Sequence, residues 1–161
     1  MNFKYGLKKG LPIGIGYLAV SFAFGVLAVT GLSPLMATFI SFTNLTSSGQ
    51  YAGVLMIFEG ASYFEIGLTV LLINLRYSLM SISLSQKIEP DTPRWKRMIV
   101  GFGIADEIYG VAVTEKGKIS ASYFIGLMLL PILGWTLGTA LGAFGANLMP
   151  ERILIALNIS F

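Results

Sequence analysis

Three charged side chains lie near the middle of two long apolar stretches of the sequence. Arg76 is central in a stretch over residues 66–86. Asp106 and Glu107 lie at the middle of a second stretch over residues 98–114. A charge at the centre of a bilayer is costly, so each one needs a partner or a role. Two interpretations stay open: an ion pair that holds two helices together, and a site at the membrane midplane for an ion or a polar substrate.

Polar residues accompany Arg76 along its stretch. Asn74, Ser78, Ser81 and Ser85 recur at i, i+4, i+7 and i+11, which places them on one helix face. Arg76 itself points about 200° away from Asn74 around the helix. Serines in membrane helices often bond their own backbone, which is the purely structural explanation. Beside a central arginine, the stripe favours the wall of a polar path, with Asn74 and Arg76 as candidate binding residues.

A polar run interrupts the apolar stretch over residues 35–58. The sequence Asn-Leu-Thr-Ser-Ser-Gly-Gln occupies residues 44–50. Irregular backbone at membrane depth needs protein or water to satisfy its polar groups, and such residues can supply them. A half-helix beginning near Gly49 would direct backbone N–H groups and partial positive charge at the membrane centre, where they attract a carboxylate. Gly49 and Gln50 are therefore candidate substrate-binding residues, and a simple kink is the alternative.

The two adjacent carboxylates are predicted to have different roles. Neighbouring helical residues point about 100° apart, so only one faces a given cavity. Asp106 is the shorter and suits a fixed partner such as Arg76, so it is assigned to structure or coupling. Glu107 reaches further, with Gly103 and Gly110 on its helical face leaving space beside it. Glu107 is therefore predicted to be the titrating, substrate-facing group.

The elements that must position these residues are membrane-spanning helices. Only 12% of the 161 residues are charged, about half the usual share in soluble domains. No charge occurs from Gly10 to Phe58 or from Ile119 to Pro150, and a bilayer-spanning helix needs only about 20 apolar residues. The prediction is an all-α polytopic transmembrane bundle forming one domain over residues 1–161. Its about five segments are expected near residues 11–29, 35–58 (broken), 66–86, 98–114 and 119–149.

Positive charges predict the orientation of the chain. Lys4, Lys8 and Lys9 precede the first segment, and the strongest basic cluster lies in residues 87–97. Short basic loops face the cytoplasm, but three complete crossings would put these two groups on opposite sides. The conflict disappears if residues 35–58 enter and leave on one side as a re-entrant pair of half-helices. The N-terminus is then cytoplasmic; a complete crossing with a weak orientation signal is the alternative.

A row of small residues predicts one close helix contact. Gly134, Gly138 and Gly142 recur every four residues, and Ala146 continues the row. Small residues at this spacing allow two backbones to approach closely within a membrane. We expect the row to pack against another helix, either of this chain or of a second one.

Composition excludes several classes of site. The chain has no Cys and no His, which rules out Cys/His zinc sites, haem ligation by His, and Ser-His or Cys-His catalysis. We expect no metal and no cofactor. The net charge of +3 is explained by cytoplasmic loops, so no nucleic-acid partner is expected. No phosphate-binding loop is present, so ATP drive is not expected within this chain.

Motifs in order along nearly the whole chain resemble the AzlC family of branched-chain amino-acid permeases. They are Gly10-Leu11-Pro12-Ile13-Gly14-Ile15-Gly16-Tyr17, Ser48-Gly49-Gln50-Tyr51, Ile73-Asn74-Leu75-Arg76-Tyr77, Ala105-Asp106-Glu107 and Gly134-Trp135-Thr136-Leu137-Gly138-Thr139. The resemblance implies a permease of the bacterial cytoplasmic membrane. It further implies a small AzlD-type membrane partner and export of branched-chain and similar apolar amino acids.

The sequence departs from the family pattern at two places. Family members continue beyond the point where this chain stops, and residues 157–161 resemble the start of a further segment. We therefore expect either a fragment or a short form lacking the C-terminal part. In addition, Asn44-Leu45-Thr46-Ser47 stands where family members usually have a smaller, more apolar run.

These observations predict an efflux permease subunit for apolar amino acids that is not an enzyme. An apolar zwitterion needs a cation or helix N-terminus, an anion and an apolar pocket, and the candidate residues offer all three. Export would be driven by an ion gradient, with protons as the candidate coupling ion. One alternative is a non-transporting scaffold or assembly subunit. Another is an intramembrane lipid-modifying enzyme that uses Asp106 and Glu107.

Overall fold

The computed structural model describes residues 2–146, and in this part the chain forms seven α-helices. They are α1 (Phe3–Ala28), α2 (Pro34–Thr43), α3 (Ser47–Phe58), α4 (Tyr63–Lys87), α5 (Arg94–Phe102), α6 (Asp106–Thr114) and α7 (Ala121–Gly145). Helices α1, α4 and α7 are long and apolar enough to cross a bilayer. The predicted all-α membrane bundle is confirmed. Residues 147–149 of the fifth predicted segment, and residues 157–161, lie outside the described residues.

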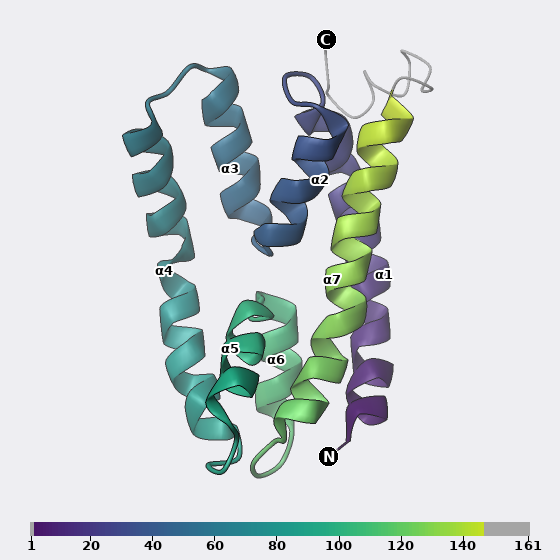
Figure 1. Cartoon of the computed structure of the whole chain (residues 1–161), viewed down its shortest axis with the longest axis vertical. Helices are drawn as coiled ribbons and strands as arrows, with labels where there is room; N and C mark the ends of the chain where they lie inside the picture. Colours follow the sequence, from purple (N-terminus) through teal and green to yellow (C-terminus); the bar gives the residue numbers. More distant parts are fainter. Residues whose placement is uncertain (1, 147–161) are drawn as a thin grey trace.

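Helices α2 and α3 form a pair of half-helices. Figure 1 shows α2 running from the end where α1 finishes to mid-height, where the chain turns and α3 returns to the same end. Pro34 and the hydroxyl of Ser33 begin α2, because proline suits a first turn and the hydroxyl accepts from the Met36 N–H at 3.3 Å. Extended backbone at Asn44 and Thr46 makes the break. The segment predicted to be broken therefore has the re-entrant arrangement.

The predicted fourth segment, residues 98–114, is also broken, which corrects the expectation of a single span. Helix α5 ends at Phe102, Ala105 has extended backbone, and α6 begins at Asp106. This second pair comes from the opposite end of the molecule and meets the first at mid-height (Figure 1). The bundle thus has three long helices and two pairs of half-helices. No polar run marks the second break, because residues 103–105 are Gly-Ile-Ala.

Helices α1 and α7 run side by side in the same direction (Figure 1). Their backbones touch through glycines: a Cβ on Gly134 would overlap the Gly14 carbonyl, and one on Gly138 would overlap the Leu18 carbonyl. A Cβ on Gly142 would meet the Phe22 carbonyl in the same way. The glycine row therefore packs within the chain. Close backbone approach of this kind is how membrane helices associate without a hydrophobic driving force.

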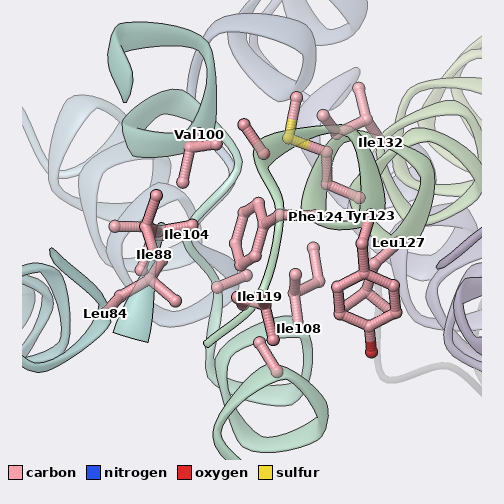
Figure 2. Packing of buried hydrophobic residues seen from close by; sticks show 14 residues of the cluster. Leu84, Ile88, Val100, Ile104, Ile108, Ile119, Tyr123, Phe124, Leu127 and Ile132 are labelled. Carbon is pink, nitrogen blue, oxygen red and sulfur yellow. The ribbon is translucent and has the colours of Figure 1, made fainter. Parts of the chain in front are cut away.

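The largest apolar core fastens the α5–α6 pair to the ends of α4 and α7. Figure 2 shows its members converging from these four helices and the loops between them: Leu84, Ile88, Val100, Ile104, Ile108, Ile119, Tyr123, Phe124, Leu127 and Ile132. A backbone bridge joins the two loops, because the Glu89 N–H donates to the Ile119 carbonyl at 3.0 Å. The lower half of the bundle is thereby held as one packed unit.

The lysines, Arg94 and Arg97 gather at one end of the molecule, whereas Arg76 lies at mid-depth. The N-terminus of α1 and the loops on either side of the α5–α6 pair lie there together (Figure 1). Contacts join these parts: the Lys9 ammonium lies 3.9 Å from the Glu115 carboxylate, and the Lys87 ammonium donates to the Val113 carbonyl at 3.1 Å. The two basic groups noted in the sequence therefore share one end of the bundle. We call this the basic end.

Candidate functional site

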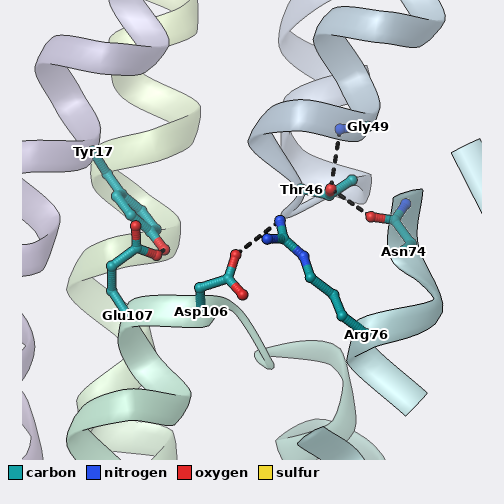
Figure 3. A network of polar contacts seen from close by, with 7 residues as sticks. All are labelled: Tyr17, Thr46, Gly49, Asn74, Arg76, Asp106 and Glu107. Atoms are coloured by element: carbon teal, nitrogen blue, oxygen red, sulfur yellow. Dashed lines mark hydrogen bonds and ion pairs between the residues drawn. The ribbon is translucent and has the colours of Figure 1, made fainter. Parts of the chain in front are cut away.

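An ion pair joins α4 to α6 at mid-depth (Figure 3). The guanidinium Nη2 of Arg76 lies 2.9 Å from Oδ2 of Asp106. Arg76 is near the centre of α4, whereas Asp106 is the first residue of α6 and is placed there by the break before it. A carboxylate in the first turn of a helix is also stabilised by the helix dipole. The side chains of Arg76 and Asp106 are 42% and 36% exposed, so the pair lies at the edge of the described bundle.

Glu107 faces the opposite side, toward α1. Its carboxylate accepts a hydrogen bond from the phenol of Tyr17 (Figure 3). The Tyr17 ring packs edge-on against the indole of Trp135 on α7, with ring centroids 5.2 Å apart. The two adjacent carboxylates therefore point to different partners, as helix geometry requires. Asp106 pairs with α4, and Glu107 is held against the α1–α7 pair.

A small cavity lies between these two groups of contacts, and we call it the charged cavity. Its volume is about 70 Å³. Both carboxylates line it, together with aromatic and apolar side chains and the first residue of α3: Tyr17, Val20, Leu45, Ser47, Tyr77, Ala105 and Trp135. The two carboxylates and the apolar walls of the cavity therefore lie together where the two pairs of half-helices approach each other.

The N-terminus of α3 faces the same region but its Gly49 amide is capped. The Thr46 hydroxyl accepts from the Gly49 N–H at 3.3 Å and donates to Oδ1 of Asn74 at 2.7 Å (Figure 3). Helix α3 begins at Ser47, two residues before the position expected from the sequence. Glycine is needed at position 49 because a Cβ there would lie 2.9 Å from the Asn74 amide nitrogen. The half-helix near Gly49 is present, but the Gly49 N–H itself is taken up by Thr46; an anion-binding role of this helix N-terminus stays a prediction.

Gln50 belongs to a buried network rather than to the charged cavity. Its amide oxygen accepts from the Trp135 indole N–H at 3.3 Å, and its amide nitrogen donates to the Ser41 hydroxyl at 3.2 Å. Ser41 is in turn 2.7 Å from the Thr139 hydroxyl. Gln50 is only 4% exposed, so its polar atoms are satisfied inside the bundle. The structure therefore does not bring Gln50 to the charges, but lets it orient Trp135, which lines the cavity.

Two further expectations about glycines differ in outcome. A Cβ on Gly103 would collide with the Met128 sulfur, so Gly103 allows α7 to approach and leaves no space beside Glu107. Gly110 has open space where a Cβ would be. The expected role of Gly103 is therefore corrected, because Gly103 follows the last residue of α5 and does not share a helix with Glu107.

Sequence reasoning assigned no role to Tyr17, Trp135, Thr46 or Tyr77. The first two carried a usable signal, because tyrosine and tryptophan within an uncharged span combine an apolar ring with a polar atom that needs a partner. No similar signal marks Tyr77. Among residues 2–146, no cluster of three or more acidic, His or Cys side chains could hold a metal ion.

Residues 12–149 match the family described as AzlC protein. The chain belongs to the AzlC family. Within that family it is 32% identical over 151 residues to "Inner membrane protein YgaZ" of Escherichia coli (strain K12), covering 91% of this chain and 62% of that relative. It is also 32% identical over 152 residues to a membrane protein of Archaeoglobus fulgidus, covering 93% of this chain and 66% of the relative. This AzlC chain thus spans less than two thirds of the length of these relatives.

No solved structure matches this AzlC chain. The family match confirms the resemblance seen in the sequence motifs, and the long apolar helices agree with a multi-pass membrane protein.

Proposed function

We propose that this chain is a permease subunit that exports branched-chain or similar apolar amino acids across the bacterial cytoplasmic membrane. The observation that carries the proposal is the charged cavity, which two carboxylates line at mid-depth beside apolar and aromatic walls, and whose Asp106 is paired with the Arg76 guanidinium. An apolar amino acid is a zwitterion with a greasy side chain, so it needs all three kinds of contact. Because a charged side chain inside a membrane is costly in free energy, its presence there indicates a functional site.

Each charged group has a distinct partner in the proposed complex. The Arg76 guanidinium holds the substrate carboxylate, because its planar fork can bind both oxygens. Glu107 receives the ammonium group, and Asp106 orients Arg76. Asn74 stands behind Arg76 on α4, fixed by its bond to Thr46. In the empty site Arg76 is paired with Asp106, and Glu107 is bound by Tyr17. When the substrate enters, its carboxylate takes the place of Asp106 and its ammonium group takes the place of Tyr17.

Glu107 is the proposed coupling group. An ion gradient must drive export, and a carboxylate can carry a proton between the two sides. The phenol of Tyr17 donates to Glu107 in the described arrangement. A protonated Glu107 no longer attracts an ammonium group, so proton binding and substrate binding compete at one side chain. Protons are therefore the coupling ion we propose.

A small AzlD-type subunit is the proposed partner on the side of α4. In the described structure no residue in the most apolar part of α4 is buried, whereas half of the residues in the most apolar part of α7 are buried. Arg76 and Asp106 are both more than one third exposed on this side. Hydrocarbon cannot solvate such groups, so another helix has to cover them.

The basic end is proposed to be cytoplasmic. All lysines of the chain lie at residues 4–9, 87–96 or 116–118, which are parts of this end. The loop between α3 and α4, at the other end, contains Glu59 and no basic residue. In intact cells, single cysteines replacing Lys4 and Arg94 should both be protected from an impermeant thiol reagent, whereas Glu59→Cys should react. Reaction at Lys4→Cys or Arg94→Cys would contradict the orientation.

Transport of labelled leucine tests the function directly. Membrane vesicles containing this chain, with and without an AzlD-type subunit, should export leucine along an imposed proton gradient. Arg76→Lys keeps the charge but loses the fork, and should reduce export about tenfold at normal protein level. Arg94→Lys is the matched control, because Arg94 is exposed at the start of α5 and does not line the charged cavity. Equal export by both variants would contradict the substrate role of Arg76.

A further inference from the structure

We propose that the side chains of Leu45 and Tyr77 form a gate between the charged cavity and a polar access route that runs along the serine face of α4 to the basic end. The inference rests on the proposed function, because it gives the solute its path to the site. It adds a direction of entry and two gating residues.

The proposed gate lies between two hollows that have two lining residues in common. On the far side of the charged cavity lies a larger hollow of about 450 Å³. Leu45 and Tyr77 line both spaces. Polar side chains line much of the larger one, among them Asn44, Asn74, Ser78 and Ser81. We call this larger space the polar hollow.

The route continues from the polar hollow to the basic end. A third hollow of about 290 Å³ adjoins the polar hollow, and Ser81 and Gly101 line both. Ser85 and Arg97 line its outer part, near the end of α4. The hydroxyls of Ser81 and Ser85 donate to carbonyls of their own helix, at 3.2 Å and 2.7 Å. Their oxygens still accept hydrogen bonds, so the wall can hold water or a passing ammonium group.

Both gating side chains are placed where they can respond to the site. Leu45 lies in the non-helical break between α2 and α3, so it can move without disturbing a helix. Tyr77 follows Arg76 on α4, and the guanidinium lies 5.3 Å from the centre of the Tyr77 ring. When Arg76 turns from Asp106 to a substrate carboxylate, this cation–π contact changes as well. Occupancy of the charged cavity thereby acts on the gate.

Cysteine accessibility tests the gate without any transported solute, because the chain has no native cysteine. Ser47 lines the charged cavity but not the polar hollow, and Ser78 lines the polar hollow but not the charged cavity. Ser47→Cys and Ser78→Cys are reacted with a hydrophilic methanethiosulfonate in vesicles that expose the basic end. Ser78→Cys should react readily and Ser47→Cys slowly.

Opening the gate should change only the inner reporter. Tyr77→Ala or Leu45→Ala should raise the reaction rate of Ser47→Cys about tenfold, because a minor open state becomes the main one. The rate of Ser78→Cys should not change. Leu79→Ala is the matched control, since Leu79 is exposed on α4 and lines neither space. Two gate variants are used so that a folding defect in one leaves the other informative.

Three results would overturn the gate: an unreactive Ser78→Cys, a Ser47→Cys rate unaffected by both gate variants, or an equal effect of Leu79→Ala. These outcomes do not depend on leucine transport. Failure of the proposed function would instead appear as the expected labelling pattern without any leucine export.

Discussion

Helices α7 and α4 are equally long and similarly apolar, yet they are packed very differently. Both have 25 residues, and the mean hydropathy of the most apolar part is 1.8 in α7 and 1.4 in α4. In that part, 50% of the residues of α7 are buried, whereas none of the residues of α4 is. Glycines bring α7 into backbone contact with α1, whereas α4 presents large exposed leucines such as Leu72 and Leu79. The apolar composition of a helix therefore favours its insertion into the membrane, whereas small residues determine which helix it packs against.

The candidate site lies on the boundary between these two regions. The α1–α7 pair supplies Tyr17 and Trp135, which are held by close packing and by Gln50. Helix α4 supplies Arg76, whose side chain is 42% exposed, and Tyr77, which is half-buried at the edge of the largest core. One wall of the site is thus buried inside the described bundle, and the other lies at its edge.

The largest effect is expected from the α1–α7 contact. Gly134→Leu would force the backbones of α1 and α7 apart, which should destabilise the chain by at least about 3 kcal/mol and prevent a monodisperse product. Gly16→Leu is the matched control, because a Cβ on Gly16 meets nothing within 4 Å. Expression level and size-exclusion profile in detergent measure both variants. Equal behaviour of the two would remove the contrast between the packed and the open region.

A smaller loss of stability is expected on the α4 side. Asp106→Asn leaves Arg76 without an anion, which should cost about 2 kcal/mol, less than for a fully buried pair because both side chains are partly exposed. Arg76→Gln combined with Asp106→Asn removes both charges, so it should restore the protein level but not leucine export. Thermal stability in detergent, measured beside export, checks this. A double variant less stable than Asp106→Asn alone would show that the pair does not act through charge.

Glu107 should affect coupling more than stability. Glu107→Gln should abolish gradient-driven export, because the amide cannot carry a proton, and should leave only a weakened exchange of leucine, because the amide oxygen still accepts a hydrogen bond from the ammonium group but carries no negative charge. Tyr17→Phe, which removes the donor but keeps the ring against Trp135, should have a weaker effect on export. Counterflow and gradient-driven efflux are compared in the same vesicles. A stable but uncoupled Asp106→Asn beside a working Glu107→Gln would reverse the two assignments.

The smallest effect is expected at the break before α3. Thr46→Val removes the cap of Gly49 and the bond to Asn74, which should cost about 1 kcal/mol of stability. Thr43→Val is the matched control, because the Thr43 hydroxyl makes only short-range bonds. It donates to carbonyls of its own helix, Phe39 at 2.9 Å and Ile40 at 3.3 Å, and accepts from the adjacent Asn44 amide at 3.2 Å. Thermal unfolding in detergent should separate them. Loss of stability in Thr43→Val alone would contradict the importance of the cap.

The features that the sequence predicted are those with a local signal. Six polar or small residues among the seven at 44–50 indicated the first break, and the four-residue glycine spacing indicated a close contact. Arg76 and Asp106 could be paired because each charge at mid-depth needs a partner. Each of these signals, a polar run, a glycine spacing or a charge at mid-depth, can be recognised within a single segment.

The features that were missed depend on contacts between segments. At the second break Gly103 lies against Met128 on α7, and residues 103–105 carry no polar signal of their own. Gln50 looked like a binding residue, but Ser41 and Trp135 from two other helices take up its polar atoms. No periodicity within α3 contains that information.

Fluorescence of Trp135 measures most directly whether the charged cavity binds an apolar zwitterion. Trp95, which is exposed on α5, is replaced by Phe, so Trp135 is the remaining tryptophan and lines the cavity. Leucine should produce a saturable change, whereas 4-methylpentanoate and 3-methylbutylamine, which each lack one charge, should not. The leucine concentration that gives half of the change should rise about tenfold in Arg76→Lys, because the charge stays but the planar fork is lost. An equal response to either single-charge analogue, or an unchanged half-saturating leucine concentration in Arg76→Lys, would contradict the proposed site.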